Sequence, residues 1–313
     1  MKLSQAVREY VEYKQALGMR FHTEAVMLQA FCRALGAETA LADITEGQIC
    51  AYLNPPGPLT RFRQRKREVL TGFNRFVMGR EYTSSLPISP LPPPQLPSFV
   101  PYIFTREELR RLLAGVPHHR KAKKLQPHTL RLVLLLLYGT GLRISELVSL
   151  TLADVDLPAG LLTVRDTKFY KTRLVALGPQ LIQALTLYAV ERKKAGHSQQ
   201  PEAAFFVLRS GAPANAPGIR DAFSSLRDYA GIRHEGSGQR PRLHDLRHSF
   251  AVHRLVSWYQ QGKDVQDLLP DLAVYLGHVS LASTQLYLTL TPELLEQASA
   301  RFERYALAEV RHD

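Results

Sequence analysis

Pro241-Arg242-Leu243-His244-Asp245-Leu246-Arg247-His248 is the most informative stretch of this chain. Its pattern predicts the start of a helix, so His244 and Arg247, three positions apart, share one helix face. Further along, Tyr275-Leu276-Gly277-His278 leads to Tyr287. An arginine, two histidines and a tyrosine suit phosphodiester chemistry, because cations hold a phosphate, a histidine accepts a proton and a phenol acts as the nucleophile.

Length and charge narrow the class of protein. The 313 residues are 45% hydrophobic, which is enough for a sizeable core and favours two domains over one. The formal net charge is +12, from 40 Lys and Arg against 28 Asp and Glu. This excess indicates an anionic partner, and nucleic acid is the commonest one for a basic protein.

The cysteine content and the length of the apolar runs indicate the cellular compartment of the protein. Cys32 and Cys50 are too few for a disulfide framework and lack the spacing of zinc ligands. The N-terminal stretch has no apolar signal-peptide core, and the longest strongly apolar run, 132–138, is far shorter than a membrane span. We therefore expect a soluble, cytoplasmic protein with no membrane partner.

A proline-rich segment divides the chain. Seven prolines lie between Pro87 and Pro101, and such a segment lacks backbone donors and favours extended conformations. We expect a domain at 1–85, a linker at 86–101 and a second domain at 102–313.

The first domain is expected to be helical throughout. Apolar spacing predicts helices from about Val7 to Leu17 and from Val26 to Leu35. Asp43 is the predicted cap of a third helix that ends near Leu53. A fourth, from about 59 to 78, carries a basic cluster: Arg61, Arg63, Arg65, Lys66 and Arg67. We expect this cluster to face DNA; the alternative is an ordinary solvated helix face.

The second domain combines helices with a small sheet. Thr105-Arg106-Glu107-Glu108 is a capping box that predicts a helix through Leu113, and 130–138 predicts a buried helix. Alternating residues at 161–165 and 173–177 predict two strands joined by a polar turn, with helices from there to the C-terminus. The fold class is therefore mainly α with a small antiparallel β-sheet.

Two upstream segments add candidate phosphate-binding residues. Gly139-Thr140-Gly141-Leu142-Arg143 places an arginine after a glycine turn at a helix start, where a guanidinium and backbone amides suit a phosphate. Taken alone, the segment is explained better by a simple surface ion pair between Arg143 and Glu146, and only the later residues favour the phosphate role. Lys168 lies in the predicted hairpin turn and suits either a phosphate contact or a proton donor, with Lys171 as its competitor.

A zinc site is the main competing interpretation of the histidines. His244 and His248 are four positions apart, as in a zinc-binding helix. However, the metalloprotease pattern requires Glu directly after the first histidine, whereas Asp245 stands there and Arg247 intrudes. We therefore expect His248 to pack or hydrogen-bond inside the domain, and we interpret His253 as structural.

These motifs together resemble the tyrosine recombinase (phage integrase) family. The resemblance covers nearly the whole chain and depends on six residues in order: Arg143, Lys168, His244, Arg247, His278 and Tyr287. It implies a two-domain DNA clamp, in which a helical core-binding domain precedes a mixed α/β catalytic domain. The long segment between Arg247 and His278 is similar to that of recombinases carried by transposons and other mobile elements.

The resemblance also implies a mechanism. Tyr287 would attack the scissile phosphate and form a 3′-phosphotyrosyl link. Arg143, Arg247 and His278 would bind the non-bridging oxygens, Lys168 would protonate the leaving 5′-oxygen, and His244 would assist proton removal from the phenol. Neither ATP nor a metal ion would be needed, because the covalent link conserves the phosphodiester energy.

Partners follow from the same resemblance. The chain would bind duplex DNA at specific core sites and assemble there as a homotetramer through a C-terminal helix at 292–313, whose alternative is packing on its own domain. Accessory DNA-binding or recombinase proteins would steer the outcome. Lys171, Arg173 and Arg242 complete the expected DNA contacts. The competing functions are a type IB topoisomerase, a non-catalytic DNA-binding regulator and a zinc hydrolase.

Overall fold

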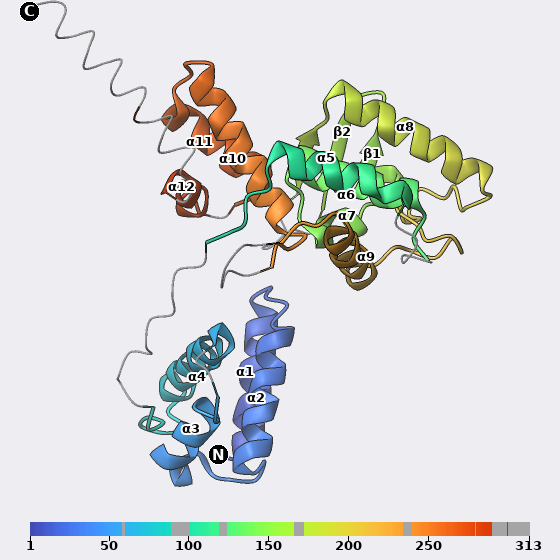
Figure 1. Ribbon diagram of the computed structural model, residues 1–313. Helices are drawn as coiled ribbons and strands as arrows, with labels where there is room; N and C mark the ends of the chain where they lie inside the picture. Colours follow the sequence, from blue (N-terminus) through green and yellow to red (C-terminus); the bar gives the residue numbers. More distant parts are fainter. Residues whose placement is uncertain are drawn as a thin grey trace, which may run out of the picture. The chain divides into compact units, whose positions relative to one another are not determined.

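The computed structural model describes residues 1–57, 60–88, 100–118, 124–165, 172–233, 240–278 and 280–289, together with Ser299. The chain divides into two compact units, Met1–Phe99 and Val100–Asp313 (Figure 1). Within the described ranges, no helix is both long and apolar enough to cross a membrane.

The first unit is helical, as its sequence predicts. Helix α1 packs against α2 and α4, and α3 packs against the same pair α2 and α4 (Figure 1). Apolar side chains from these helices, among them Leu28, Phe31 and Phe73, are fully buried between them. The helices are α1 (Leu3–Ala16), α2 (His22–Leu35), α3 (Glu46–Leu53) and α4 (Arg61–Gly79).

Helix α3 begins with a different cap from the one that its sequence suggested. Thr45, not Asp43, is the capping residue: its hydroxyl accepts the Gln48 N–H, and the Gln48 side chain accepts the Thr45 N–H at 2.9 Å. Asp43 instead ends a short 3-10 turn. The reciprocal pair satisfies two backbone donors, whereas an aspartate two positions earlier lies too far back to do so.

The second unit packs its helices around α6 and a small sheet. Helix α6 contacts both α8 and α10, and its leucines are buried on most sides (Figure 1). The Thr105–Glu108 capping box forms as predicted at the start of α5, with the Glu108 N–H 3.1 Å from Thr105 Oγ1. The helices are α5 (Arg106–Gly115), α6 (Pro127–Thr140), α7 (Ile144–Val148), α8 (Pro179–Lys194), α9 (Ala216–Tyr229), α10 (Asp245–Gln260), α11 (Val265–Leu276) and α12 (Ala282–Thr289).

The sheet is antiparallel and small. In the described part of the chain its order is β1 (Val155–Asp156), β2 (Leu161–Val164), β3 (Arg173–Ala176). Leu161 pairs with Ala176, and Val164 pairs with Arg173. The two predicted strands and the fold class are confirmed, whereas β1 was not predicted because two residues carry no alternation. The turn that holds Lys168 and Lys171 lies outside the described residues.

Two glycine turns bring distant helix ends together. Gly141 ends α6 with φ +65°, and Gly277 ends α11 with φ +69°. A Cβ on Gly141 would lie 2.6 Å from Leu276 Cδ2, and one on Gly277 would lie 2.7 Å from Arg173 Nη1. Both positions therefore need glycine for its conformation and for its size. The carbonyl-rich ends of α6 and α11 meet at this point.

Candidate active site

A buried arginine joins the two helix ends. Arg247, on α10, is 2% exposed and donates from Nη1 to the Gly141 carbonyl at 2.6 Å and from Nη2 to the Leu276 carbonyl at 2.7 Å. The carbonyls at a helix C-terminus lack intrahelical partners and carry partial negative charge, so they suit a cation. Burial, with Arg143 nearby, lowers the pKa of Arg247 to about 10, and the guanidinium stays charged at neutral pH.

Arg143 lies beside Arg247 and is held by a buried carboxylate. Its Nη2 donates to the Gly277 carbonyl at 3.1 Å, and its Nη1 pairs with Glu146 Oε1 at 2.7 Å. Arg173, from β3, pairs with the same carboxylate at 2.8 Å. Burial alone would raise the pKa of Glu146, but the bonds from Arg173 and Arg143 outweigh it and hold the pKa at about 2. Glu146 therefore fixes both guanidinium groups as a permanent anion.

The charge of this cluster favours an anionic ligand. The carboxylate of Glu146 pairs with both Arg143 and Arg173, and the guanidinium of Arg247 is within electrostatic range of it. Arg143 keeps 32% of its side chain exposed, whereas Arg173 keeps 11%. Guanidinium groups in a partly desolvated site bind phosphate oxygens strongly and with defined geometry. The surplus positive charge is thus open to solvent mainly through Arg143.

Tyr287 lies against the same cluster. It is on α12, is 3% exposed, and its Oη lies 3.0 Å from His248 Nδ1. The ring of His278 stacks on it with centroids 6.1 Å apart. Burial raises the pKa of the Tyr287 phenol, although the cations of Arg247 and Arg143 oppose the shift. The phenol is therefore neutral at rest and needs a base before it can act as a nucleophile.

The three nearby histidines are neutral. Burial, with Arg247 nearby, lowers the pKa of His278 to about 3, and its Nδ1 lies 2.7 Å from Thr284 Oγ1. The pKa of His248 is lowered to about 3 by burial and by His244. His244 occupies the N-cap position of α10 without a capping bond from its side chain and reaches solvent, yet desolvation by nearby protein atoms and the charge of Arg247 lower its pKa to about 4.

Five of the six residues expected to be catalytic therefore come together: Arg143, His244, Arg247, His278 and Tyr287. Lys168 lies outside the described residues, as does its competitor Lys171. The parts that Glu146 and His248 take in the cluster were not predicted from the sequence. Glu146 was considered only as a surface partner of Arg143, although it is 8% exposed, and His248 was expected to hydrogen-bond inside the domain without Tyr287 being foreseen as its partner.

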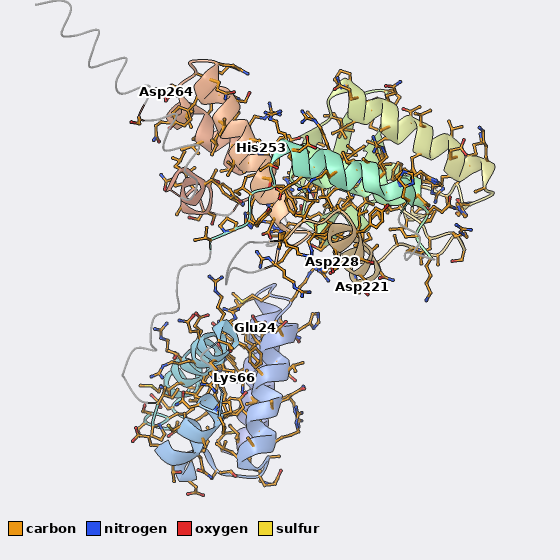
Figure 2. The ribbon with its side chains drawn as sticks, in the orientation of Figure 1. Glu24, Lys66, Asp221, Asp228, His253 and Asp264 are labelled. Carbon is orange, nitrogen blue, oxygen red and sulfur yellow. The ribbon has the colours of Figure 1, made fainter. Side chains whose placement is uncertain are left out.

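The expected DNA contacts have varied surroundings. Arg173 faces inward, because it binds Glu146 and donates to the Tyr275 carbonyl at 3.1 Å. Arg242 is 46% exposed and pairs with Asp245 at 2.9 Å. On α4, Arg63 donates to the Pro55 carbonyl, and Arg65 pairs with Glu24 and Glu68. The ammonium group of Lys66 lies 4.2 Å from the centre of the Tyr52 ring. Glu24 and Lys66 are labelled in Figure 2. Arg61 is exposed and Arg67 is half-buried.

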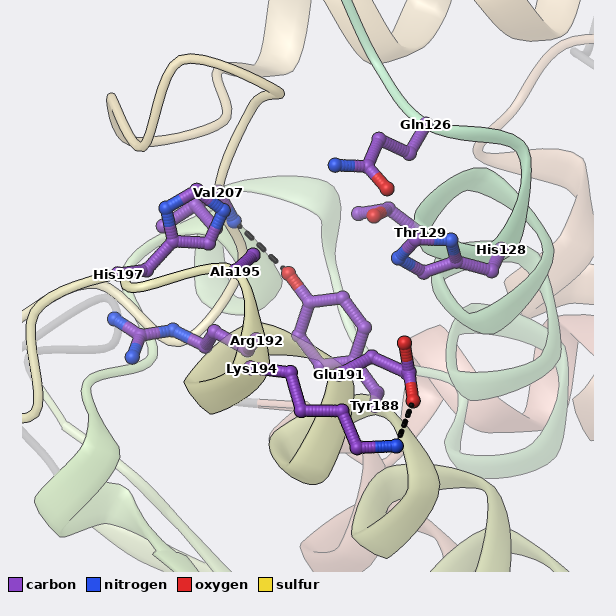
Figure 3. Close-up of a pocket in the computed structure, with 10 residues that line it drawn as sticks. All are labelled: Gln126, His128, Thr129, Tyr188, Glu191, Arg192, Lys194, Ala195, His197 and Val207. Carbon is purple, nitrogen blue, oxygen red and sulfur yellow. Dashed lines mark hydrogen bonds and ion pairs between the residues drawn. The ribbon is translucent and has the colours of Figure 1, made fainter.

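A separate polar pocket of about 290 Å³ lies between α6 and α8. Figure 3 shows Tyr188 at its centre, with its Oη accepting the Val207 N–H at 3.1 Å and Lys194 paired with Glu191 at 3.0 Å. The guanidinium group of Arg192 donates hydrogen bonds to backbone carbonyls, including that of Ala204 at 2.9 Å. None of the described candidate catalytic residues lines this pocket.

The lowered pKa of the buried His253 can be tested through the pH dependence of protein stability, independently of the active site. Its Nδ1 lies 2.8 Å from Tyr138 Oη, and burial, with Arg106 nearby, lowers its pKa to about 4 (Figure 2). Since the folded-state pKa is below the unfolded value of about 6.5, protonation favours unfolding, and stability is lost as the pH falls below 6.5. We expect His253 to contribute a loss of roughly 2 kcal/mol between pH 7 and pH 5. Urea unfolding of His253→Asn should show a correspondingly smaller loss; equal pH dependence in both proteins would contradict this expectation.

No group of three or more metal-binding side chains is arranged around a common point in the described ranges. The cluster is instead one of arginines, a carboxylate, neutral histidines and a buried phenol. Such a set can hold an anion and deliver a phenol to it.

Comparison with known proteins agrees with this chemistry. Residues 103–293 match the model described as the phage integrase family. The chain is 34% identical over 303 residues to the "Putative integrase/recombinase y4rB" of Sinorhizobium fredii strain NBRC 101917 / NGR234, covering 96% of each chain.

Solved structures share the fold at lower identity. The integrase of transposon Tn1549, in complex with transposon right end DNA, has a TM-score of 0.70 at 16% identity and covers 98% of this chain and 100% of its own. A lambda integrase tetramer bound to a Holliday junction has a TM-score of 0.65 at 17% identity, covering 92% of this chain and 77% of its own. The expected family, fold class and enzyme class are confirmed. The chain belongs to the phage integrase family, the tyrosine recombinases, which are enzymes that cleave and rejoin DNA at specific sites.

Proposed function

We propose that Tyr287 is the nucleophile with which this recombinase cleaves DNA. The observation that carries the proposal is the position of its phenol, buried against Arg247, His248 and His278 in a cluster with surplus positive charge. Tyr287 Oη attacks the scissile phosphorus, the bond to the 5′-oxygen breaks, and a 3′-phosphotyrosyl link forms. The 5′-hydroxyl of a partner strand then reverses the step and releases the tyrosine.

The surrounding residues take complementary roles in this proposal. Arg143, Arg247 and His278 bind the non-bridging oxygens, on which charge builds in the transition state. Thr284 Oγ1 lies 2.7 Å from His278 Nδ1. If the hydroxyl donates there, the neutral ring carries its proton on Nε2, which then donates to the phosphate. Glu146 keeps Arg143 oriented.

Two roles rest on family resemblance. Lys168, in the turn predicted from the sequence, protonates the leaving 5′-oxygen, and His244 assists removal of the phenol proton. The arginines supply the electrostatic stabilisation that a metal ion gives elsewhere, so the reaction needs neither metal nor ATP.

We also propose how the chain binds DNA and assembles. Residues 1–85 and 102–313, joined by the segment 86–101, both contact one duplex at a specific core site. The basic cluster of α4 with Arg242 and Lys171 supplies phosphate contacts. Strand exchange takes place in a tetramer formed through residues 292–313, in the cytoplasm, with accessory proteins directing the outcome. The long 247–278 segment supports a place among recombinases of mobile elements.

A trapping experiment tests the proposed reaction. The substrate is a nicked duplex that releases a short fragment after cleavage, with its sequence found by trapping adducts on DNA from the flanks of the coding gene. We expect a denaturation-resistant adduct with EDTA present and ATP absent, and protease digestion should place the DNA on the peptide that contains Tyr287. Linkage to another residue, or loss of the adduct in EDTA, would overturn the proposal. Relaxation of plasmids that lack the site would instead favour a type IB topoisomerase.

A further inference from the structure

His248 stands between the expected general base and the proposed nucleophile. Its ring meets the ring of His244 edge-on at 4.9 Å, and on its other side lies the ring of Tyr287 at 5.6 Å. Its Nδ1 is 3.0 Å from Tyr287 Oη, a hydrogen-bond distance. His244 thus touches His248, whereas His248 touches the phenol.

The phenol needs an acceptor for its proton. Arg247 also lies close to Tyr287, but a guanidinium has donors only and stays charged. It can therefore stabilise a phenolate but cannot take the proton. His248 is half-buried and neutral, so its ring offers one nitrogen as an acceptor. A neutral phenol that donates to Nδ1 accounts for the observed distance.

We propose that His248 is the catalytic general base that accepts the phenol proton when Tyr287 attacks DNA. This inference rests on the proposed function of Tyr287. The O–H bond of Tyr287 breaks and its proton moves to His248 Nδ1, while Oη bonds to phosphorus and the 5′-oxygen leaves with a proton from a separate acid. In the rejoining step, His248 returns the proton to Oη as the tyrosine departs.

Substrate binding strengthens the base. In the free protein, burial and the charged or polar groups around the ring, His244, Arg242, Arg247 and His278, keep His248 unprotonated. A bound phosphodiester brings negative charge among the same arginines and offsets them. His248 therefore becomes a better proton acceptor when the scissile phosphate is in place. His244, which reaches solvent beside it, thus assists removal of the phenol proton indirectly, by positioning the His248 ring.

The same helix supplies a matched control. His253 Nδ1 lies 2.8 Å from Tyr138 Oη, which repeats the histidine–tyrosine bond of His248. Both histidines are on α10 and both are half-buried. The pair of His253 and Tyr138 lies outside the arginine cluster, so it shows what such a bond contributes to structure alone.

The test compares His248→Asn with His253→Asn. Asparagine keeps a hydrogen-bonding group near the Nδ1 position but cannot take a proton. We expect His248→Asn to bind the nicked duplex as the unaltered protein does and to form the phosphotyrosyl adduct at least about 10²-fold more slowly, the usual effect of losing a general base. His253→Asn should form the adduct at the ordinary rate. Unfolding curves establish that both variants are folded, and His248→Gln replaces His248→Asn if it is not.

Two further readouts separate a base from a structural support. Hydroxide must deprotonate the phenol in His248→Asn, so its adduct rate should rise about tenfold per pH unit between pH 7 and 9, while the unaltered protein changes little. On a substrate with sulfur in place of the 5′-bridging oxygen, the leaving group needs no proton, and His248→Asn should stay slow.

The outcomes distinguish a failure of the His248 proposal from a failure of the Tyr287 proposal. An adduct rate for a folded His248 variant within about threefold of the unaltered protein, with no added pH dependence, would overturn the role of His248. Adduct formation by Tyr287→Phe would overturn the proposed nucleophile itself. An inactive Tyr287→Phe beside a fully active His248→Asn would refute only the present inference.

Discussion

Tyr287→Phe is expected to abolish the covalent adduct on the nicked duplex while leaving DNA binding within about threefold. The substitution removes one oxygen from a side chain that is 3% exposed, so the ring still fills its place in the core. The substitution removes the hydrogen bonds of the phenol oxygen to His248 Nδ1 and to Arg247, each of which contributes about 1 kcal/mol. Gel shift measures binding, and denaturing electrophoresis measures the adduct.

Tyr275→Phe is the control for this experiment. Tyr275 is on α11, its Oη donates to the Ala176 carbonyl at 3.0 Å, and its ring stacks on Phe250. Its loss should cost a hydrogen bond of about 1 kcal/mol without affecting the adduct rate. Persistence of the adduct in Tyr287→Phe together with its loss in Tyr275→Phe would move the nucleophile to Tyr275.

The phosphodiester chemistry could be predicted from the sequence because it depends on the types of the residues and on their order along the chain. His244 and Arg247 share a helix start, and the glycine before Arg143 predicted a turn that the structure forms. What the sequence could not show was how the arginines are held. Arg247 bonds to a carbonyl 106 positions away, and Arg143 bonds to one 134 positions away. Backbone carbonyls leave no trace in residue identity, so only the fold shows these contacts.

The buried role of Glu146 and the bond between His248 and Tyr287 were not predicted because local residue spacing fits more than one arrangement. Glu146 is three positions from Arg143, a spacing that fits an exposed ion pair as well as a buried one. Arg173 settles the question, since it joins the pair from a strand 27 positions away. His248 was ambiguous for the same reason: its neighbour Tyr287 is on another helix, so helix periodicity could not indicate the bond.

The second large effect is expected from Arg143→Ala, which should slow adduct formation about 10²–10³-fold, as for losing one donor to an oxyanion. Arg143 is the cleanest arginine to remove, because Glu146 keeps its bonds to Arg173 and stays paired. Arg247→Ala should reduce cleavage at least as much, but it leaves two buried carbonyls without donors, at about 1–3 kcal/mol each. Unfolding curves would therefore shift for Arg247→Ala far more than for Arg143→Ala.

Arg110→Ala is the matched control for Arg143→Ala. Arg110 also pairs with a glutamate three positions away, at 3.1 Å, but the pair is exposed on α5. Its removal should leave the adduct rate unchanged and cost less than about 1 kcal/mol. Arg143→Lys keeps the charge but loses the planar fork, so it should restore only part of the rate. Ordinary cleavage by a folded Arg143→Ala would show that the phosphate is held elsewhere, because the exposed part of the guanidinium cluster would then be dispensable.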